Sequence, residues 1–312
     1  MDISVIICTY NRSASLKKSL DSLRSMKVPE GVIWEIIIVD NNSHDDTRNV
    51  VAEFKKNSGL PVSYIFKKEQ GTSFARNEGI KVSKGNILLF TDDDVIADIY
   101  WLDSCLCAFK GYDAACIGGK VLPLWEKPCP KWLTKELHHV VALLDLGNET
   151  FRLNKSTVWG NNMAFKASVF QKYGYFDTSI GRTGEKLFAG EETTYIDKLI
   201  EGGENVYHCP DMKVNHYIPG FRIKKSYFRK WGYCQGEQFA KKMGHCEFRN
   251  IMGVPLYAVR AIGEGFFRYL WFSISLPSNA FREQLKVFHY LGFVIGRIKY
   301  GDDMPVEGVD TQ

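Results

Sequence analysis

The aromatic back part of the sequence has no hydrophobic run long enough to cross a membrane. Between residues 250 and 296, the longest stretch without a charged residue is 269–281, which has 13 residues and contains Pro277. A transmembrane helix needs about 20 mostly apolar residues, so this stretch is too short. The chain starts directly with a strand-like segment at residues 3–8, and we therefore expect no signal peptide before the fold.

Metal-type cysteine spacing is also missing. Of the eight cysteines, the closest two are Cys105 and Cys107, with a single residue between them, and several others lie in apolar segments. This spacing does not match the paired ligands of zinc sites, and we expect reduced thiols in a cytosolic protein. The chain has no repeat of fixed period, and only residues 301–312 have the composition of a flexible tail.

Strand-like and helical patterns alternate along the first hundred residues. The apolar runs that predict strands are followed by segments with leucine or valine at helical spacing. This alternation indicates an α/β fold, with a mostly parallel sheet flanked by helices and right-handed crossovers. The four predicted strands are residues 3–8, 34–39, 62–66 and 87–90.

The turn after the first predicted strand contains no glycine. It consists of Thr9, Tyr10, Asn11 and Arg12, whereas a dinucleotide-binding fold carries a Gly-x-Gly-x-x-Gly cradle at this place. This turn argues against a dinucleotide-binding fold, and any phosphate must be bound by other residues.

Three consecutive carboxylates form the most informative motif of the chain. Asp92, Asp93 and Asp94 directly follow the apolar run at residues 87–90. Ligands of open α/β sheets collect outside the carboxyl ends of such strands. Adjacent carboxylates repel one another unless a cation joins them, and Mg²⁺ or Mn²⁺ is held by one or two carboxylates together with substrate phosphates. The alternative is an acidic turn exposed to water.

A second acidic motif follows a glycine-punctuated loop at residues 179–190. Glu191 and Glu192 stand at the start of a predicted helix that ends at Gly202. Two short strands are predicted after it, around residues 206–207 and 213–214, and the second leads to His216.

Charge is distributed unevenly, although the net charge is only +4. Residues 222–299 contain 14 Lys or Arg and 4 Asp or Glu, a local excess of +10, which leaves −6 for the remainder. The acidic front part is consistent with a metal site. The basic, aromatic back part predicts helices at 221–300 that either lie on an anionic membrane surface or pack on the protein core.

Six short motifs, in this order and on these predicted elements, resemble glycosyltransferase family 2. The likeness covers about residues 1–220 and implies the GT-A fold, with a nucleotide-sugar half at about 1–120 and an acceptor half at about 121–220. The motifs are residues 4–12, residues 38–43, Ala75-Arg76-Asn77-Glu78-Gly79, Asp92-Asp93-Asp94, Gly160-Asn161-Asn162 and Gly190-Glu191-Glu192.

The resemblance also implies roles for individual residues. The nucleotide would be bound by Thr9, Tyr10, Arg12, Asp40, Arg76, Asn77, Asp92 and Asp93, with Asp40 on the base. The metal, Mg²⁺ or Mn²⁺, would be bound by Asp94 and Asp92, with His216 as a further ligand or phosphate contact. The cleft for donor sugar and acceptor would be lined by Gly160, Asn161 and Asn162, and the aromatic rings of Trp125 and Trp132 are candidates for stacking on the acceptor.

Simpler interpretations of these residues remain open. Asp40 would then cap the following helix, and Arg76 would form a surface ion pair with Glu78 or Glu69. His216 would be a structural histidine, and the two tryptophans would close a small core.

The chain departs from the family pattern at two places. The usual Glu-Asp pair is Glu191-Glu192 here, and motif position assigns the base to Glu192, with Glu191 as an orienting or acceptor-binding partner. The Gln-x-x-Arg-Trp motif of processive polymerases is absent, because Ser226 stands where that motif has glutamine before Trp231. We therefore expect the transfer of one sugar per encounter.

Together these features predict an inverting enzyme that uses a nucleotide-diphosphate sugar, with a UDP-sugar favoured. The expected acceptor is a glycan or lipid-linked glycan in surface polysaccharide assembly, and no nucleic acid is involved. The expected location is the cytoplasm, at the inner face of the cytoplasmic membrane. The rival classes are a sugar nucleotidyltransferase, which would need a glycine- and arginine-rich loop after the first strand, and a non-catalytic nucleotide-sugar-binding protein.

Overall fold

The computed structural model describes residues 1–182, 187, 189–243, 250–251, 253–275 and 277–300. The tail predicted at 301–312 lies outside the described residues. The chain divides into two compact units. The first consists of Met1–Glu126, Glu136–Gly184 and Gly190–Ile218, and the second of Lys127–Lys135, Glu185–Ala189 and Pro219–Gln312.

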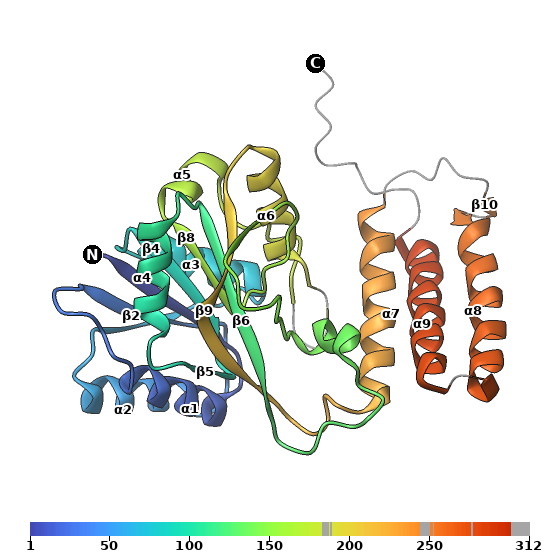
Figure 1. Cartoon of the computed structure of the whole chain (residues 1–312), viewed down its shortest axis with the longest axis horizontal. Helices are drawn as coiled ribbons and strands as arrows, with labels where there is room; N and C mark the ends of the chain where they lie inside the picture. Colours follow the sequence, from blue (N-terminus) through green and yellow to red (C-terminus); the bar gives the residue numbers. More distant parts are fainter. Residues whose placement is uncertain (183–186, 188, 244–249, 252, 276, 301–312) are drawn as a thin grey trace. The chain divides into compact units, whose positions relative to one another are not determined.

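A nine-stranded sheet is the centre of the first unit (Figure 1). The four strands predicted from the front of the sequence are present and pair in parallel, in the order β3-β2-β1-β4. The sheet then changes direction, because β8 is antiparallel to both of its neighbours, β4 and β6. The order continues β8-β6-β9-β5, and β7 pairs with β9. The bounds are β1 Ile3–Thr9, β2 Trp34–Asp40, β3 Val62–Phe66, β4 Ile87–Asp92, β5 Val95–Ala97, β6 Cys116–Trp125, β7 Phe151–Leu153, β8 Asn162–Lys166 and β9 Val206–Ile218.

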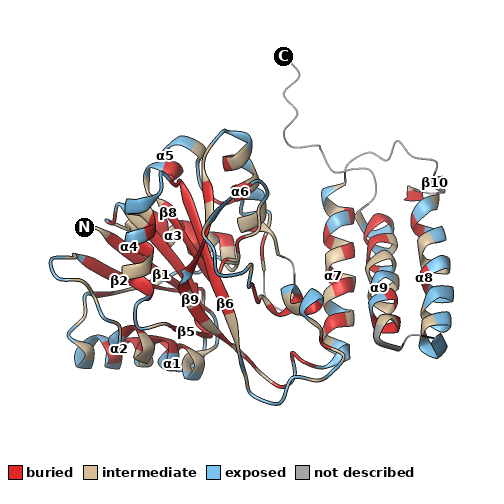
Figure 2. Ribbon diagram, in the orientation of Figure 1, coloured by how far each residue is buried: buried red, intermediate tan, exposed pale blue. Residues whose placement is uncertain are grey.

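Helices cover both faces of this sheet, and Figure 2 shows the burial of the strands between them. On one face, α3 (Thr72–Val82), α5 (Ser168–Tyr173) and α6 (Glu191–Glu201) share one hydrophobic core with alternate residues of the strands. The remaining helices of this unit are α1 (Ser13–Arg24), α2 (Thr47–Ser58) and α4 (Trp101–Gly111). In α1 the buried Leu16, Leu20 and Leu23 recur at helical spacing, so one side of the helix is apolar.

The two short strands predicted before His216 form one long strand, β9, so this prediction was wrong. β9 runs parallel to β6, and their register shifts between Gly119 and Lys120, which pair with Cys209 and Lys213 respectively. The extra residues of β9, which include Pro210, are accommodated as a bulge within the strand. As a result β9 continues to the edge of the sheet where β4 ends.

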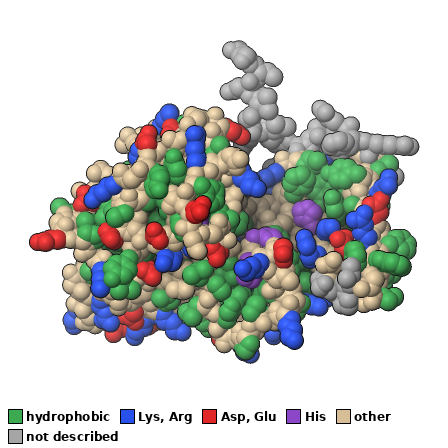
Figure 3. Space-filling model, viewed as in Figure 1, with side chains coloured by type: hydrophobic (Ala, Val, Ile, Leu, Met, Phe, Trp, Pro, Cys, Tyr) green, Lys and Arg blue, Asp and Glu red, His purple; other side chains and the backbone are tan. Residues whose placement is uncertain are grey.

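The described part of the second unit contains three long helices, and the predicted C-terminal helical region is therefore confirmed. They are α7 (Lys225–Lys242), α8 (Leu256–Ser275) and α9 (Pro277–Tyr300), with a two-strand pair, β10 (Asn250–Ile251) and β11 (Val254–Pro255). Helix α9 packs against both α7 and α8. No helix within the described part of the chain is both long and apolar enough for a transmembrane span. Figure 3 shows hydrophobic and basic side chains together on the visible face of these helices.

Candidate active site

The aspartate triplet lies where β4 ends, next to Thr9 at the end of β1 and to Arg12 in the turn after it. The Thr9 hydroxyl donates to Asp93 Oδ2 at 2.8 Å. The Arg12 guanidinium donates to Asp93 Oδ1 at 3.1 Å and to Asp94 Oδ2 at 2.9 Å. Burial raises the pKa of Asp93 to about 6, although the charge of Arg12 opposes this shift. The turn after β1 therefore binds the triplet directly, as its place at the same sheet edge predicts.

His216 reaches the same place from β9. Its partner across the sheet is Val95 of β5, the residue after the triplet. His216 Nε2 lies 3.2 Å from Asp94 Oδ1, and both side chains are buried. A residue more than a hundred positions away in the sequence is thereby adjacent to the triplet, because β9 runs the full length of the sheet.

These side chains have the donor atoms that a divalent cation uses, namely carboxylate oxygens and an imidazole nitrogen. Asp92 is partly exposed, whereas Asp94 is buried and contacts both Arg12 and His216. Within the described residues, no group of three or more His, Cys, Asp or Glu is arranged to hold a metal ion. Mg²⁺ and Mn²⁺ are often held by only one or two carboxylates together with substrate phosphates, and the donor atoms present here have the chemistry for that arrangement.

Arg76 of α3 lies between the aspartate triplet and the acidic pair of α6. Its Nη1 donates to Glu191 Oε1 at 2.8 Å and lies 3.9 Å from Glu192 Oε2, and its Nη2 lies 3.9 Å from Asp92 Oδ1. Arg76 and Glu191 are both buried. One buried guanidinium thus faces both acidic motifs of the sequence.

The alternative in which Arg76 forms a surface ion pair is wrong, because Arg76 is buried against Glu191. Lys67 pairs with Glu69 and Glu78 instead. Close packing also fixes the position of Arg76. A Cβ atom added at Gly160 would clash with the Arg76 guanidinium, so any larger residue at position 160 would require the guanidinium to move.

The acidic pair occupies the first turn of α6, after Gly190 in a left-handed conformation at φ 106°. A negative charge is favourable at this end of a helix. Glu191 Oε2 and Glu192 Oε2 are buried and have no hydrogen-bond partner among the described residues. Burial, and secondarily the charge of Glu191, raises the pKa of Glu192 to about 7. Glu191 therefore forms the ion pair with Arg76, whereas Glu192 has a raised pKa and a carboxylate oxygen that can accept a proton.

Asp40 ends β2 at the same edge of the sheet. Its Oδ1 accepts the Ser43 backbone N–H at 2.8 Å, and its Oδ2 accepts the Tyr64 hydroxyl at 2.6 Å. Helix α2 begins at Thr47, so the alternative in which Asp40 caps this helix is wrong. Tyr10, in the turn after β1, is an exposed aromatic residue.

Not every amide of the predicted site is available to a ligand. Asn77 donates to the carbonyl of Phe176 at 2.8 Å and accepts that residue's backbone N–H at 3.0 Å, so its contacts are structural. Asn162 donates to the carbonyls of Lys120 and Met212 and accepts the Trp101 indole N–H, each at 2.8 Å. Both amide groups connect distant segments of the unit.

Asn161 differs from these two amides. Its Nδ2 donates to the carbonyl of Ala142 at 3.1 Å, whereas its Oδ1 is buried without a hydrogen-bond partner in the described structure. Ala142 itself has a positive φ of 54°, which is uncommon for a residue other than glycine. The loop that contains Ala142 is therefore fitted closely to Asn161.

A sequence comparison identifies the family. The family described as glycosyl transferase family 2 matches residues 4–174. The chain belongs to this family. The predicted membership is confirmed, and the chain is accordingly a glycosyltransferase.

Individual relatives agree with this assignment. The chain is 25% identical over 240 residues to glucosyl-dolichyl phosphate glucuronosyltransferase of Haloferax volcanii, which covers 76% of this chain and 75% of the relative. Mannosyltransferase PcManGT from Pyrobaculum calidifontis, in complex with GDP-Man and Mn²⁺, superposes with a TM-score of 0.62 and 15% identity, over 97% of this chain and 88% of that chain. TarS 1–349 of S. aureus, in complex with UDP-GlcNAc, has a TM-score of 0.58 and 16% identity, over 96% and 80%. These two structures confirm the predicted GT-A fold.

The two tryptophans predicted for the acceptor cleft of this glycosyltransferase lie in different units. Trp125 is at the end of β6, and its ring packs edge-on against His138 of a 3₁₀ helix, η1 (Lys135–Val141), at 6.0 Å. Trp132 belongs to the second unit, where its ring packs against Phe228 and Phe281. His138 could not be predicted as a neighbour of Trp125, because neither its spacing nor its neighbours in the sequence form a known motif.

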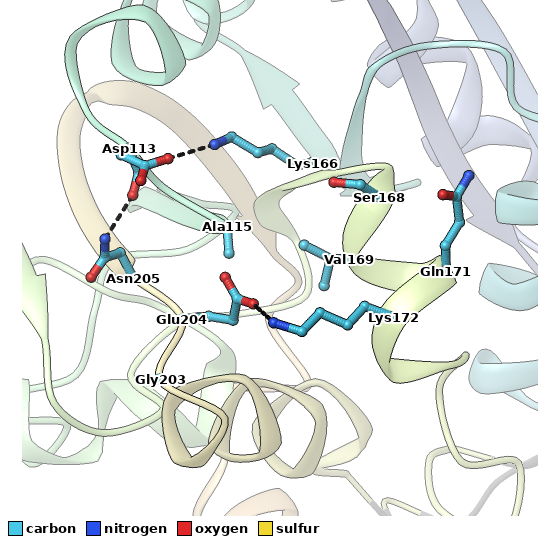
Figure 4. Close-up of a pocket in the computed structure, with 10 residues that line it drawn as sticks. All are labelled: Asp113, Ala115, Lys166, Ser168, Val169, Gln171, Lys172, Gly203, Glu204 and Asn205. Atoms are coloured by element: carbon cyan, nitrogen blue, oxygen red, sulfur yellow. Dashed lines mark hydrogen bonds and ion pairs between the residues drawn. The ribbon is translucent and has the colours of Figure 1, made fainter.

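A cavity of about 610 Å³ lies at the opposite end of the sheet (Figure 4). Lys166 at its rim pairs with Ile87, the first residue of β4, whereas the triplet begins at Asp92, the last residue of β4. The two lysines of this cavity are paired with carboxylates, Lys166 with Asp113 at 2.8 Å and Lys172 with Glu204 at 2.7 Å. The carboxylates of this cavity are thus paired with its lysines, unlike the adjacent carboxylates of the two acidic motifs. We therefore place the candidate active site at the carboxyl ends of the strands.

Proposed function

We propose that this family 2 enzyme transfers a sugar, with inversion at the anomeric carbon, from a nucleotide-diphosphate sugar to a hydroxyl group of a glycan or lipid-linked acceptor. The observation that supports this most strongly is the position of Arg76, which contacts Glu191 and faces both Asp92 and Glu192. Arg76 thereby connects the sheet edge that we propose binds the diphosphate with the candidate base, Glu192. In our proposal residues 1–120 bind the donor and residues 121–220 the acceptor.

In this mechanism Glu192 takes the proton from the acceptor hydroxyl as the hydroxyl oxygen attacks the anomeric carbon. A new carbon–oxygen bond forms on one face of the sugar, and the bond to the diphosphate breaks on the other. The buried Oε2 atom of Glu192 and its pKa of about 7 support this role, because a general base works best with a pKa near the working pH. Arg76 holds Glu191 in place, so Glu191 acts as the orienting partner.

Asp92, Asp94 and His216 would hold Mg²⁺ or Mn²⁺ together with the donor diphosphate. Such an ion stabilises the negative charge that develops on the departing diphosphate. The Mn²⁺ in the complex of mannosyltransferase PcManGT supports this proposal. Arg12 neutralises Asp93 and the second oxygen of Asp94, which leaves Asp92 as the partly exposed carboxylate of the three.

We propose UDP as the nucleotide, with Asp40 accepting a hydrogen bond from the base. The TarS complex with UDP-GlcNAc supports UDP, whereas the PcManGT complex contains GDP-Man. Both bases present an N–H group to a carboxylate, so ligand binding has to distinguish them.

The acceptor in our proposal is attached to a lipid, and the enzyme works at the inner face of the cytoplasmic membrane in surface polysaccharide assembly. Support comes from the similar Haloferax volcanii enzyme, whose name specifies a dolichyl phosphate acceptor, and from the excess of +10 in residues 222–299. Transfer of one sugar per encounter is proposed because Ser226 replaces the glutamine of the processive motif. The alternative of a sugar nucleotidyltransferase is disfavoured by the glycine-free turn after β1, and that of a non-catalytic protein by the presence of both acidic motifs.

A thermal-shift panel of UDP-, GDP- and dTDP-sugars, each with and without Mn²⁺, tests the donor assignment. A ligand that binds only the folded protein raises the melting temperature in proportion to its binding free energy. We expect the largest increase with a UDP-sugar and Mn²⁺ together. A larger increase with GDP-sugars would replace UDP by GDP, and no increase with any of the donors would contradict the proposed function.

A further inference from the structure

Helix α8 leaves a large part of its apolar surface exposed. Of its twenty residues, all of which the structure describes, only Ala258 and Gly265 are buried. Phe267, Trp271 and Ile274 are 72%, 70% and 89% exposed. Together with the exposed Leu270 they stand at positions i, i+3, i+4 and i+7, so they form a single stripe on one side of the helix, which we call the α8 face.

The packing of the second unit explains why this face is uncovered. Helices α7 and α9 approach closely at glycines, since a Cβ atom at Gly236 or Gly292 would clash with the backbone of the opposite helix. Of the other two long helices, α8 has substantial contact only with α9. A small core of Ala240, Ala258 and Phe293 lies next to this contact. Among the described residues of this unit, the stripe on α8 stays largely exposed, and contiguous exposed patches of this kind mark interaction sites.

Exposed arginines lie on α8 and near the start of α9. Arg260 and Arg268 are exposed on the same helix, Arg260 in a pair with Glu264 at 2.6 Å, and Arg282 is exposed near the start of α9. The local excess of +10 in residues 222–299 opposes self-association, because a second copy would present the same positive charge. An anionic lipid surface offers both an apolar layer and complementary charge, and Trp271 is of a residue type enriched at membrane interfaces.

We propose that the α8 face inserts into the interface of an anionic lipid membrane, with Phe267, Trp271 and Ile274 among the acyl chains and Arg268 at the headgroups. This inference rests on the membrane location in the proposed function and specifies the surface that provides it. It requires no transmembrane helix, because a helix that lies in the interface buries only one side.

Sedimentation of the full-length protein with vesicles tests the proposal. The vesicles are mixed phosphatidylglycerol and phosphatidylcholine, with phosphatidylcholine alone for comparison. We expect binding to the anionic vesicles that weakens in 0.5 M NaCl. The triple variant Phe267→Ser, Trp271→Ser, Ile274→Ser should bind these vesicles at least about tenfold more weakly than the native protein. The matched control replaces three exposed apolar residues of the first unit, Ile33, Phe66 and Tyr175, by serine and should bind like the native protein.

Several results would overturn the proposal. They are the absence of binding by the native protein, equal binding by the triple variant, and a native dimer in light scattering that becomes monomeric in the triple variant without any vesicle binding. Calorimetric titration of each protein with UDP and Mn²⁺ separates the two proposals. If the native protein binds UDP but not the vesicles, only the proposal for the α8 face is contradicted. If it binds the vesicles but not UDP, the proposed function is contradicted.

Discussion

Replacement of Glu192 by glutamine is expected to lower the turnover number by about a hundredfold or more, with nucleotide affinity unchanged. Glutamine keeps the shape of the side chain but cannot take up the proton of the acceptor hydroxyl. The side chain of Glu192 is 14% exposed and lies 3.9 Å from Arg76 Nη1, so the substitution leaves the contact between Arg76 and Glu191 in place. Steady-state kinetics and calorimetric titration with UDP measure the two quantities.

Glu192→Asp and Glu191→Gln are the matched controls. Aspartate is the usual residue of the family at this position, so Glu192→Asp should keep far more activity than Glu192→Gln. Glu191→Gln removes the charge that faces Arg76 but leaves the base. An active Glu192→Gln with an inactive Glu191→Gln would reverse the assignment, and two active variants would place the base elsewhere.

The pH dependence follows from the same carboxyl group. Burial raises the pKa of Glu192 to about 7, and a general base must be ionised to act. The value of kcat/KM in the native enzyme should therefore fall as the pH decreases below about 7 and level off above it. In Glu192→Gln this step should be lost from the residual activity. A native profile that is flat from pH 5 to pH 8 would contradict Glu192 as the base.

Removal of the Arg76 charge is expected to produce the largest loss of stability in the first unit. In Arg76→Met, Glu191 is left buried without its partner at 2.8 Å. Loss of one partner of a buried ion pair costs about 3–5 kcal/mol. For a unit of this size that cost lowers the melting temperature by roughly 10 °C. Scanning calorimetry of the native and variant proteins measures the change.

Arg24→Met is the matched control for this variant. Arg24 lies on α1, is half-exposed, and is 3.5 Å from the half-exposed Asp21. Exposed pairs contribute about 0–1 kcal/mol, so little change in melting temperature is expected. The double variant Arg76→Met, Glu191→Gln should recover part of the loss, because the unpaired charge is removed. A melting temperature of Arg76→Met equal to that of Arg24→Met would contradict the bridging role of Arg76.

Much of the parallel half of the fold could be predicted from local patterns. Each strand from β1 to β4 is a short apolar run followed by polar residues, and β4 leads directly into the aspartate triplet. Parallel strands end at one edge of a sheet. The ends of β1 and β4 therefore lie side by side, and Thr9 and Arg12 contact Asp93 there.

Contacts between distant segments could not be predicted in this way. The partner of Arg76 is Glu191, 115 residues away, and not the nearby Glu78. Pro210 and Asp211 favour a turn locally, yet pairing with β6 keeps them inside β9 as a bulge. In both cases tertiary packing outweighed local preference.

The amides show a similar limit, because a motif does not indicate how a side chain is used. Asn77 and Asn162 belong to motifs of the resemblance, but the structure uses their amides to connect backbone segments. Asn161, between Gly160 and Asn162, keeps its Oδ1 without a hydrogen-bond partner among the described residues. The adjacent motif residues Gly160, Asn161 and Asn162 therefore have different physical roles.

Calorimetric titration of the full-length protein with UDP, in Mn²⁺ and in EDTA, tests the central claim most directly. The claim is that the strand-end carboxylates bind the donor diphosphate through a shared divalent cation. UDP affinity should be on the order of tenfold or more higher in Mn²⁺ than in EDTA. This difference should disappear in Asp94→Ala and persist in Asp21→Ala, whose carboxylate lies on α1. Equal affinity of the native protein for UDP in Mn²⁺ and in EDTA would contradict the claim.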